Sequence, residues 1–451
     1  MRNDSVTLRS HILRTDVRAE QPVVLVVGSD VGCQPDWAGR VTSFSETLVV
    51  GRRATGQAQE CSLVLRDPTI SSRHLSISRT SAGEFELSDL GSTNGTYVNG
   101  DRVKFPVRLQ DGAVIFVGSH VLVFRTALLN HIEAIGHEAE SPLGSVPTVS
   151  PTFAATCRRM RLLAATSEDV LLMGEMGVGK ELYARAIHRA SGRKGAFVTV
   201  DCVATPSEHL ETELFGPSAG VLAPTATGKP GLIEQAERGT LFLDEIGELP
   251  AAIQARVLKF TEHQRLGVPW PTHSRDVDVR IIAATSRAAP SGDSSGLRPD
   301  LVAHFGADAI SVPPLRDRVE DIGAFAHGLV AGQRKPFELA AFQALCLYTW
   351  PGNIRELCRT LASAAALAQG SDRIGFEHLP SSIFATPQIR SVTRRRRPRP
   401  SPTVQELEVL LRRHHGNVLR VSRELDRKPA VVYRWARRFG LAVKGFRAHG
   451  Q

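Results

Sequence analysis

The residues of this sequence most suited to chemistry are a lysine behind a glycine-rich turn and two acids behind an apolar strand. The apolar run 170–173 leads into the turn 174–179 and Lys180, and a stretch with helical spacing follows. In this strand–turn–helix order, backbone N–H groups can surround a phosphate while the lysine adds a positive charge. The pattern predicts a phosphate-binding loop. Its residues are Gly174, Glu175, Met176, Gly177, Val178, Gly179, Lys180 and Glu181.

Glu181 stands where most such loops carry serine or threonine, so a chance glycine-rich turn has to be weighed against a phosphate site. The apolar run 239–243 tips the balance, because Asp244 and Glu245 follow it directly. A carboxylate at the end of a strand can hold Mg²⁺, and a second one can polarise an attacking water. The loop and the acid pair together favour the binding of a nucleotide with Mg²⁺.

Length and charge limit the classes of protein to consider. A chain of 451 residues is expected to hold roughly two to four domains. Lysine and arginine exceed aspartate and glutamate by 55 − 46 = 9, yet residues 391–451 alone hold 16 basic and 4 acidic residues, a balance of 16 − 4 = +12. A basic terminal segment on a near-neutral body points to nucleic acid as a partner.

The cysteines and the apolar segments indicate the cellular compartment. The sequence has no CxxC pair, which indicates reduced, mostly buried thiols and no zinc site. No stretch has the length and apolarity of a signal segment or a membrane span. We therefore expect a cytoplasmic protein without a membrane partner. The cysteines are Cys33, Cys61, Cys157, Cys202, Cys346 and Cys358.

The first part of the chain consists of short β-rich runs separated by turn residues, which predicts an all-β sandwich. Three loop pieces stand out, namely Gly51-Arg52, the run 71–74 (Ser-Ser-Arg-His) and the run 92–96 (Ser-Thr-Asn-Gly-Thr). Asn-Gly steps are common in hairpins, so tight turns alone would also explain them. In this order, however, the three pieces closely resemble a forkhead-associated (FHA) domain over residues 25–125.

The FHA resemblance implies a domain that binds phosphothreonine peptides. By this resemblance, Arg52 and Ser71 would contact the phosphate. Thr93 would line the pocket, Asn94 would hold the peptide backbone, and His74 would brace the loop. The chemistry is consistent, because a dianionic phosphate suits an arginine together with hydroxyl donors.

A linker rich in serine, proline and glycine is predicted at 126–148, and beyond it apolar strands alternate with helical stretches. This alternation predicts a parallel sheet with helices on both faces. The segment resembles the AAA+ ATPase domain of bacterial enhancer-binding proteins, which activate sigma-54 RNA polymerase, with the ATPase domain at 149–317 and a helical lid at 318–385. In that family a glutamate commonly follows the loop lysine, which removes the objection to Glu181. The matching runs are 174–181, 213–216 (ELFG), 239–250 (GTLFLDEIGELP), 279–285 (VRIIAAT), 313–322 (PPLRDRVEDI) and 350–357 (WPGNIREL).

The AAA+ resemblance implies ATP and Mg²⁺ as cofactors and a homo-oligomeric ring. Asp244 would bind Mg²⁺ and Glu245 would activate water. Arg355 would act on the nucleotide of its own subunit. Arg298 would reach the site of a neighbouring subunit, where an added positive charge stabilises the transition state. A solvated loop arginine is the alternative interpretation of Arg298.

Some positions depart from the family pattern. Residues 220–225 (GVLAPT) stand where the family's sigma-factor contact loop has GAFTGA. Leu222, Ala223 and Pro224 replace its aromatic residue, its threonine and its second glycine. Proline fixes φ and removes a hydrogen-bond donor, so the mobility of this loop should differ. The other departures are His304 at a second arginine-finger position, Asp201 at the glutamate-switch asparagine and Ser286 at the end of the sensor strand.

The C-terminal part predicts a DNA reader behind a disordered linker. Residues 386–403 form the linker, whose four consecutive arginines can add non-specific attraction to phosphates. Helical stretches at 404–413, 418–425 and 431–439 then predict a helix-turn-helix within the domain 404–445. A small helical core with a basic face is the alternative.

This segment resembles the Fis-like DNA-binding domain of enhancer-binding proteins, through Gly416-Asn417, Tyr433-Arg434 and Phe439-Gly440-Leu441. The resemblance implies contact with an upstream promoter element through the polar side of the last helix. The residues predicted to contact DNA are Tyr433, Arg434, Arg437 and Arg438. Val432, Trp435, Ala436 and Phe439 are expected to pack inward.

The predicted fold class is multidomain, with an all-β FHA sandwich, an α/β AAA+ P-loop domain with a helical lid, and an all-α helix-turn-helix. The first hypothesis is an ATP-dependent transcription regulator that senses phosphothreonine, binds promoter DNA and remodels sigma-54 polymerase. The second is a phospho-dependent DNA-binding regulator or scaffold whose ATP-binding domain no longer engages sigma-54, which the altered 220–225 loop favours. A metabolic kinase fits poorly, because no small-molecule acceptor site is evident.

Overall fold

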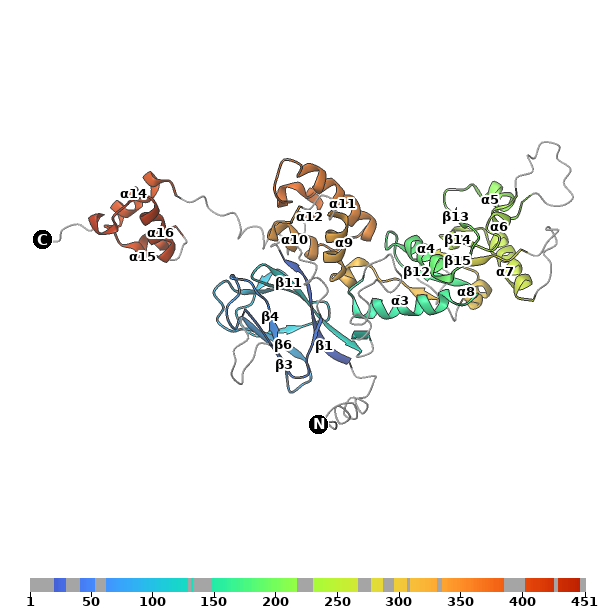
Figure 1. The fold of residues 1–451 in the computed structure, drawn as a ribbon, viewed down its shortest axis with the longest axis horizontal. Helices are drawn as coiled ribbons and strands as arrows, with labels where there is room; N and C mark the ends of the chain where they lie inside the picture. The colour runs from blue at the N-terminus through green and yellow to red at the C-terminus, as the bar shows by residue number, and fades with distance from the viewer. Residues whose placement is uncertain are drawn as a thin grey trace, which may run out of the picture. The chain divides into compact units, whose positions relative to one another are not determined.

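The structure is a computed structural model that describes residues 20–29, 41–52, 62–128, 131–132, 148–216, 230–266, 277–286, 296–305, 309–330, 335–384, 402–425 and 429–446. It divides into two compact units, residues 1–392 and 393–451, and each is described by itself. The first unit holds a β-sandwich, an α/β domain and a helical lid, and the second is helical (Figure 1). Within the described ranges, no helix combines the length and the apolar character that crossing a bilayer requires.

Two antiparallel sheets form the β-sandwich. Its strands are β1 (Glu20–Ser29), β2 (Val41–Ser43), β3 (Thr47–Gly51), β4 (Leu63–Val64), β5 (Leu75–Arg79), β6 (Phe85–Asp89), β7 (Thr96–Val98), β8 (Asp101–Arg102), β9 (Val107–Leu109), β10 (Val114–Val117) and β11 (His120–Leu128). One sheet has the order β2-β1-β11-β10-β7-β8, and the other β4-β3-β5-β6-β9, in which only the short β3–β4 pair is parallel. Alternate side chains such as Leu75 and Ile77 point inward and build the core between the sheets.

The sandwich extends beyond the predicted bounds 25–125. β1 and β11 are antiparallel partners from Glu20, opposite Leu128, to Ser29, opposite His120. Because each strand supplies the hydrogen-bonding partner of the other, the pairing continues past the apolar run that sequence patterning detects. Residues 126–128, which were predicted to belong to a linker, are therefore the end of β11.

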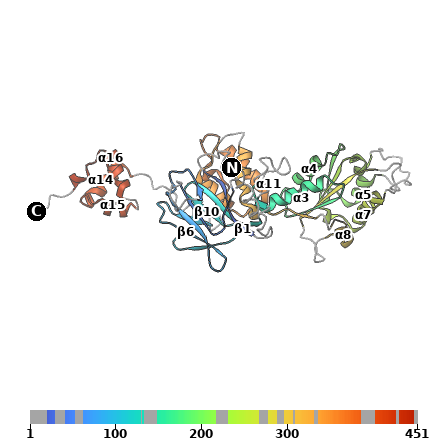
Figure 2. The ribbon, with the colours of Figure 1, turned by 60° about the horizontal axis from the view of Figure 1, so that its bottom comes forward.

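A parallel sheet with helices on both faces forms the α/β domain, as the alternating pattern predicts. Its elements are α3 (Pro151–Ala164), β12 (Val170–Met173), α4 (Lys180–Ser191), β13 (Phe197–Asp201), α5 (Ser207–Phe215), α6 (Leu232–Gln235), β14 (Thr240–Asp244), η1 (Ile246–Glu248), α7 (Ala251–Leu266), β15 (Arg280–Thr285), α8 (Pro299–Phe305) and β16 (Ile310–Ser311). The strand order is β13-β14-β15-β12-β16. Phe242 and Ile282 pack against α3 and α4, which lie side by side (Figure 2), whereas Leu241 and Ile281 pack against the helices of the opposite face.

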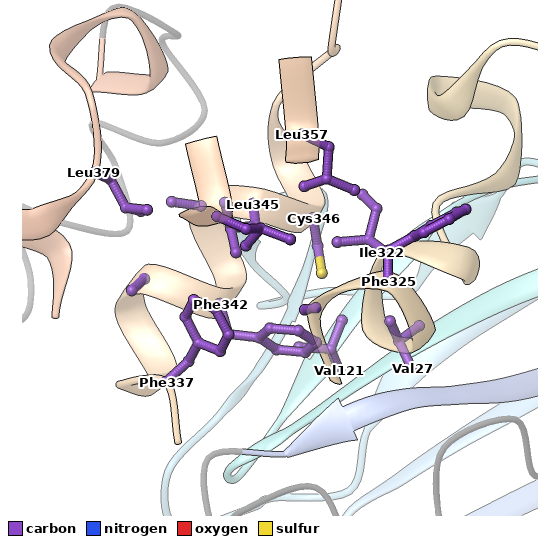
Figure 3. Close-up of a cluster of buried hydrophobic side chains, with 14 of the residues drawn as sticks. Val27, Val121, Ile322, Phe325, Phe337, Phe342, Leu345, Cys346, Leu357 and Leu379 are labelled. Atoms are coloured by element: carbon purple, nitrogen blue, oxygen red, sulfur yellow. The ribbon is translucent and has the colours of Figure 1, made fainter. Parts of the chain in front are cut away.

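The lid is helical, as predicted, and it shares a hydrophobic core with the β-sandwich. Its elements are η4 (Leu315–Arg318), α9 (Asp321–Val330), α10 (Leu339–Leu347), α11 (Asn353–Leu367), η5 (Phe376–His378) and α12 (Ser381–Phe384). Val27 and Val121 of the sandwich belong to the same buried cluster as Ile322 and Phe325 of the lid (Figure 3). At Gly323 the backbones are so close that an added Cβ would lie 2.0 Å from the Val27 carbonyl oxygen. The two parts therefore form one continuous core.

The second unit is a small helical domain with its own core. Its elements are α14 (Val404–Arg413), α15 (Val418–Glu424), α16 (Pro429–Arg438) and η6 (Val443–Phe446). Thr403 and Glu406 form a reciprocal capping box, so Thr403 begins this domain instead of ending the basic linker. α16 begins at Pro429, earlier than the predicted residue 431, because proline is preorganised for a first helical turn.

Candidate functional site

The predicted phosphate-binding loop lies between β12 and α4. Lys180 is the first residue of α4, so the positive end of the helix dipole lies at the turn 174–179. Gly177 and Gly179 have φ values of 79° and 98°, which residues with side chains rarely adopt. The lid also comes close here, because a Cβ on Gly177 would lie 2.4 Å from the Gly352 carbonyl oxygen. Glycine is thus required at residue 177 both by the turn and by the packing of the lid.

The Lys180 side chain lies inside this turn and is only 6% exposed. Its ammonium group donates to the carbonyl oxygens of Gly174 and Glu175, at 2.8 and 3.4 Å. It also lies 3.1 Å from the Glu245 carboxylate. The ammonium group therefore lies between the predicted phosphate-binding turn and the acid pair, where it can contact a phosphate or a carboxylate.

Three acids gather at the carboxyl ends of neighbouring strands. Asp201 ends β13 and lies beside Asp244, which ends β14, and Glu245 follows directly. Burial raises the pKa of Asp244 above its usual range, and the nearby charge of Glu245 raises it further. A partly buried group of carboxylates of this kind favours a bound cation such as Mg²⁺.

The Glu245 carboxylate is held from two sides. Its Oε1 pairs with Lys180, and its Oε2 accepts hydrogen bonds from the backbone N–H and the hydroxyl group of Ser286, at 2.7 and 2.8 Å. The sequence marked Ser286 only as a departure from the family pattern and gave it no role. The signal was its position after β15, but using it required knowing that β15 lies next to β14.

A cleft of about 400 Å³ opens between the loop, the acids and the lid. From the lid, α11 contributes Ile354, Arg355 and Cys358 to its wall, and the Arg355 backbone N–H donates to the Gly177 carbonyl oxygen at 3.2 Å. The structure thus brings the predicted loop, the predicted acids and Arg355 together. The lining residues are Met176, Gly177, Gly179, Lys180, Glu181, Leu182, Asp201, Val203, Asp244, Glu245, Ile354, Arg355 and Cys358.

Glu175 of the loop is clamped by the lid, a contact that sequence reasoning missed. Arg316 binds both of its carboxylate oxygens, at 2.5 and 2.8 Å, and Asn353 donates to one of them at 3.2 Å. The Arg316 hydrogen bond, followed by that of Asn353, lowers the pKa of Glu175 to about 2. Both partners lie in sequence runs that signalled the family, but the runs alone did not indicate which loop residue they contact.

Arg298 and His304 lie outside the cleft of their own chain. Arg298 makes a bidentate ion pair with Asp300, at 2.8 and 3.1 Å, and is 39% exposed. His304 lies 3.1 Å from the Asp169 carboxylate and is 12% exposed. His304 lines a different hollow, of about 410 Å³, at the amino ends of the strands.

The predicted phosphopeptide residues meet on neighbouring loops of the β-sandwich. The backbone N–H of Arg52 donates to the Ser71 carbonyl oxygen at 3.0 Å, and the backbone N–H of Thr93 donates to the Ser71 hydroxyl oxygen at 3.2 Å. The Asn94 side chain donates to the Thr69 carbonyl oxygen at 2.6 Å. The side chains of Arg52, Thr93 and Asn94 are exposed, so this end of the sandwich can receive a ligand.

His74 lies beneath these loops and is completely buried. Its Nδ1 accepts from the Ser71 backbone N–H at 3.1 Å, and its Nε2 lies 3.4 Å from the Gly95 carbonyl oxygen. Burial lowers the pKa of His74, which favours the neutral ring that this pair of contacts needs. The geometry agrees with the bracing position expected for this histidine.

The last helix of the second unit has a basic, exposed side. Tyr433, Arg434, Arg437 and Arg438 are exposed on α16. On its other side, Val432 and Ala436 are buried, and Trp435 and Phe439 pack against them as expected.

Several predicted features lie outside the described residues. These are the altered loop 220–225, the arginine run 394–397, Cys33, Cys61 and most of both linkers. The described cysteines are all free thiols; Cys157, Cys202 and Cys346 are buried and Cys358 is half-buried.

The fold and the cleft define an AAA+-type P-loop domain with a helical lid, joined to an FHA-type β-sandwich. Comparison with known families agrees with this description. The sequence matches the "Sigma-54 interaction domain" over residues 146–305, the "AAA+ ATPase lid domain" over residues 316–395 and the "FHA domain" over residues 48–118.

Relatives cover most of the chain. The transcriptional regulatory protein GlrR of Escherichia coli (strain K12) is 32% identical over 315 residues, which are 67% of this chain and 70% of GlrR. The alginate biosynthesis transcriptional regulatory protein AlgB of Pseudomonas aeruginosa is 34% identical over 333 residues, 70% of this chain and 72% of AlgB. This chain belongs to the family of sigma-54-dependent transcriptional regulators, and it carries an FHA domain. A crystal structure of NtrX from Brucella abortus in complex with ATP covers 66% of this chain and 70% of NtrX, at 28% identity and a TM-score of 0.47.

Proposed function

We propose that this regulator binds ATP with Mg²⁺ in the cleft between the α/β domain and the lid, and that it hydrolyses ATP as a homo-oligomeric ring. The observation that carries the proposal is the meeting of Lys180, Asp244, Glu245 and Arg355 around one cleft. The acids fit a cation, because Asp244 has a raised pKa next to a second carboxylate and a positive ion would relieve that repulsion.

Each residue has a defined task in this mechanism. The N–H groups of the turn and Lys180 bind the phosphates, which draws the ammonium group away from Glu245. Asp244 would hold Mg²⁺, and the positive charge supplied there would neutralise part of the phosphate charge. Glu245 keeps its contact with Ser286 and orients the attacking water as a general base.

Arginines complete the site from two subunits. Arg355 approaches the phosphates from the lid of the same chain. Arg298 leaves Asp300 and reaches the cleft of the neighbouring subunit, where its charge stabilises the transition state. Hydrolysis therefore requires assembly, and the isolated subunit turns over slowly.

The test separates binding from hydrolysis in the full chain. Lys180→Ala should abolish Mg-ATP binding in calorimetry. Lys194→Ala removes an exposed lysine that follows the end of α4, and it should leave Mg-ATP binding unchanged. Glu245→Gln should bind ATP but hydrolyse it far more slowly than the wild type. Equal affinity in Lys180→Ala, or equal rates in Glu245→Gln, would contradict the assignment.

The second unit supplies the DNA contact in this proposal. The exposed arginines of α16 face away from its core, and a helix of this kind can enter the major groove. Arg434→Ala should weaken binding to the upstream promoter element, while Arg412→Ala, on exposed α14 beside Glu408, should have little effect. A promoter footprint that is unchanged in Arg434→Ala would reject the recognition helix.

The FHA domain is proposed to read a phosphothreonine through Arg52, Ser71, Thr93 and Asn94. The support is their convergence on adjoining loops, where an arginine and hydroxyl groups surround one exposed end of the sandwich. Binding of a phosphorylated partner then changes the activity of the ATPase part of the same chain.

A second candidate function follows from Leu222, Ala223 and Pro224. With this altered loop, the chain would act as a phospho-dependent DNA-binding regulator or scaffold that binds ATP without engaging sigma-54. Capture of sigma-54 by the full chain with ATP and a metal fluoride would support the first function. DNA binding without capture would support the second.

A further inference from the structure

One guanidinium group joins the β-sandwich to the lid. Arg125 of β11 is only 11% exposed, and its Nε and Nη2 donate to the fully buried Glu320 carboxylate at 3.2 and 2.8 Å. Its Nη1 donates to Asp111 at 2.9 Å, and Nη2 also donates to the Asp317 carbonyl oxygen. Arg125 therefore binds the backbone of η4 as well as the acid that follows it.

The η4 turn also holds the phosphate-binding loop on its other side. Arg316 grips the Glu175 carboxylate with two hydrogen bonds. Arg318, which is completely buried, donates to the Val178 carbonyl oxygen at 3.0 Å. The two arginines that contact the loop thus flank Asp317, the residue whose carbonyl oxygen Arg125 holds.

A third contact ties the same turn to the loop through α11. The Leu315 backbone N–H donates to the Asn353 side-chain oxygen at 2.8 Å. The Asn353 side-chain nitrogen donates in turn to Glu175 and to the Met176 carbonyl oxygen, at 3.2 and 3.1 Å. A shift of η4 would therefore disturb several contacts of the loop at once.

We infer that Arg125 of the FHA domain is a positioning residue for the nucleotide site, because it fixes the η4 turn that holds the phosphate-binding loop. The FHA domain is then a structural part of the ATPase in addition to its role as a sensor. This inference rests on the proposed function of the cleft, and it predicts that a change in the β-sandwich alters nucleotide affinity without touching the nucleotide.

The test uses the full chain and Mg-ATP, with three variants and a matched control. Arg125→Ala removes the contact, and Arg125→Lys keeps the charge but not the forked geometry. Arg125→Met with Glu320→Met removes both charges, so that the buried Glu320 carboxylate is not left unpaired to destabilise the fold. Arg108→Ala is the control, because this exposed arginine pairs with Glu84 of the same β-sandwich.

Arg125→Ala and the double variant should bind Mg-ATP about fivefold more weakly, with Arg125→Lys between them and the wild type. KM for ATP should rise while kcat changes little, since the reacting groups are intact. Affinity for a phosphothreonine peptide should not change. A general loss of structure, in contrast, would lower this affinity as well. Arg108→Ala should behave as the wild type throughout.

Hydrogen exchange keeps the two proposals distinguishable. Amides of residues 174–180 should exchange faster in the double variant than in the control, whether or not nucleotide is added. Unchanged exchange in this loop, or ATP affinity within twofold of the wild type in the folded double variant, would overturn the role of Arg125. Wild-type protein that binds no ATP would instead contradict the proposed nucleotide site.

Discussion

The two proposed phosphate sites of this protein, the FHA loops and the nucleotide cleft, are built in opposite ways. The FHA loops present exposed side chains, held within one sandwich by short contacts from Thr93 to Ser71 and from Asn94 to Thr69. The cleft relies on the buried charge of Lys180, and residues 178 positions apart in sequence, Glu175 and Asn353, contact each other there. An exposed site of the first kind can lose a side chain at little cost to stability, whereas the second kind couples ligand binding to the packing of the lid.

The strongest test of this contrast is Arg318→Ala. Arg318 is completely buried, bonds to Val178 and to the Tyr183 hydroxyl, lies over the Phe153 ring and pairs with Asp321. Its removal leaves a buried carboxylate without its cation, which should lower the free energy of unfolding by about 3–5 kcal/mol.

Chemical denaturation of the full chain measures this change. Arg359→Ala, on the exposed side of α11, should change the unfolding free energy by less than about 0.5 kcal/mol. Similar losses in both variants would show that the support of the cleft does not depend on this buried charge.

Arg52→Ala should have the next largest effect, on binding alone. The loss of two charge-assisted hydrogen bonds corresponds to about 3 kcal/mol, or a roughly 100-fold weaker affinity for a phosphothreonine peptide. The unfolding transition should not move, because Arg52 is exposed. Calorimetry with Lys104→Ala as the control decides the matter, and a peptide affinity equal to that of the wild type would remove Arg52 from the site.

Ser286→Ala should slow hydrolysis without changing ATP affinity. It deletes one of the two hydrogen bonds from Ser286 that hold the Glu245 carboxylate, at a cost of about 1.5 kcal/mol, which is roughly a tenfold lower kcat. Ser286→Thr keeps the hydroxyl group and should retain most of the rate. If steady-state kinetics give the same kcat for alanine and threonine, the hydroxyl group does not position Glu245.

The smallest effect should be the pH dependence of the clamp on Glu175. Because the pKa of this residue is lowered from 4.5 to about 2, its stabilising effect is complete above pH 4.5 and is lost as the pH falls through about 2. The side chain is 42% exposed, so solvent screening should limit the effect to less than about 1 kcal/mol. Arg316→Ala should move the pKa back towards 4.5 in a carboxylate NMR titration, and an unshifted pKa would contradict the clamp.

Local pattern was enough to predict most elements of this molecule. The apolar strand before Gly174, the helix that begins at Lys180 and the acids at the end of β14 are contiguous signals, and the structure brings them together. The contacts that sequence reasoning missed are non-local. Nothing near Arg125 indicates that its partner is Glu320, 195 positions away, and nothing near Ser286 indicates Glu245. Such pairs depend on strand order and domain packing, which hydrophobic periodicity does not encode.

The absence of a side chain at Gly323 has a consequence for protein engineering. α9 approaches β1 so closely that any larger residue would displace the Val27 carbonyl group. A chimera that grafts a different sensory module onto this lid must therefore bring a strand edge that accepts a bare helix backbone. Conversely, alanine at this position would be a minimal wedge for separating the two modules while leaving the surface of each intact.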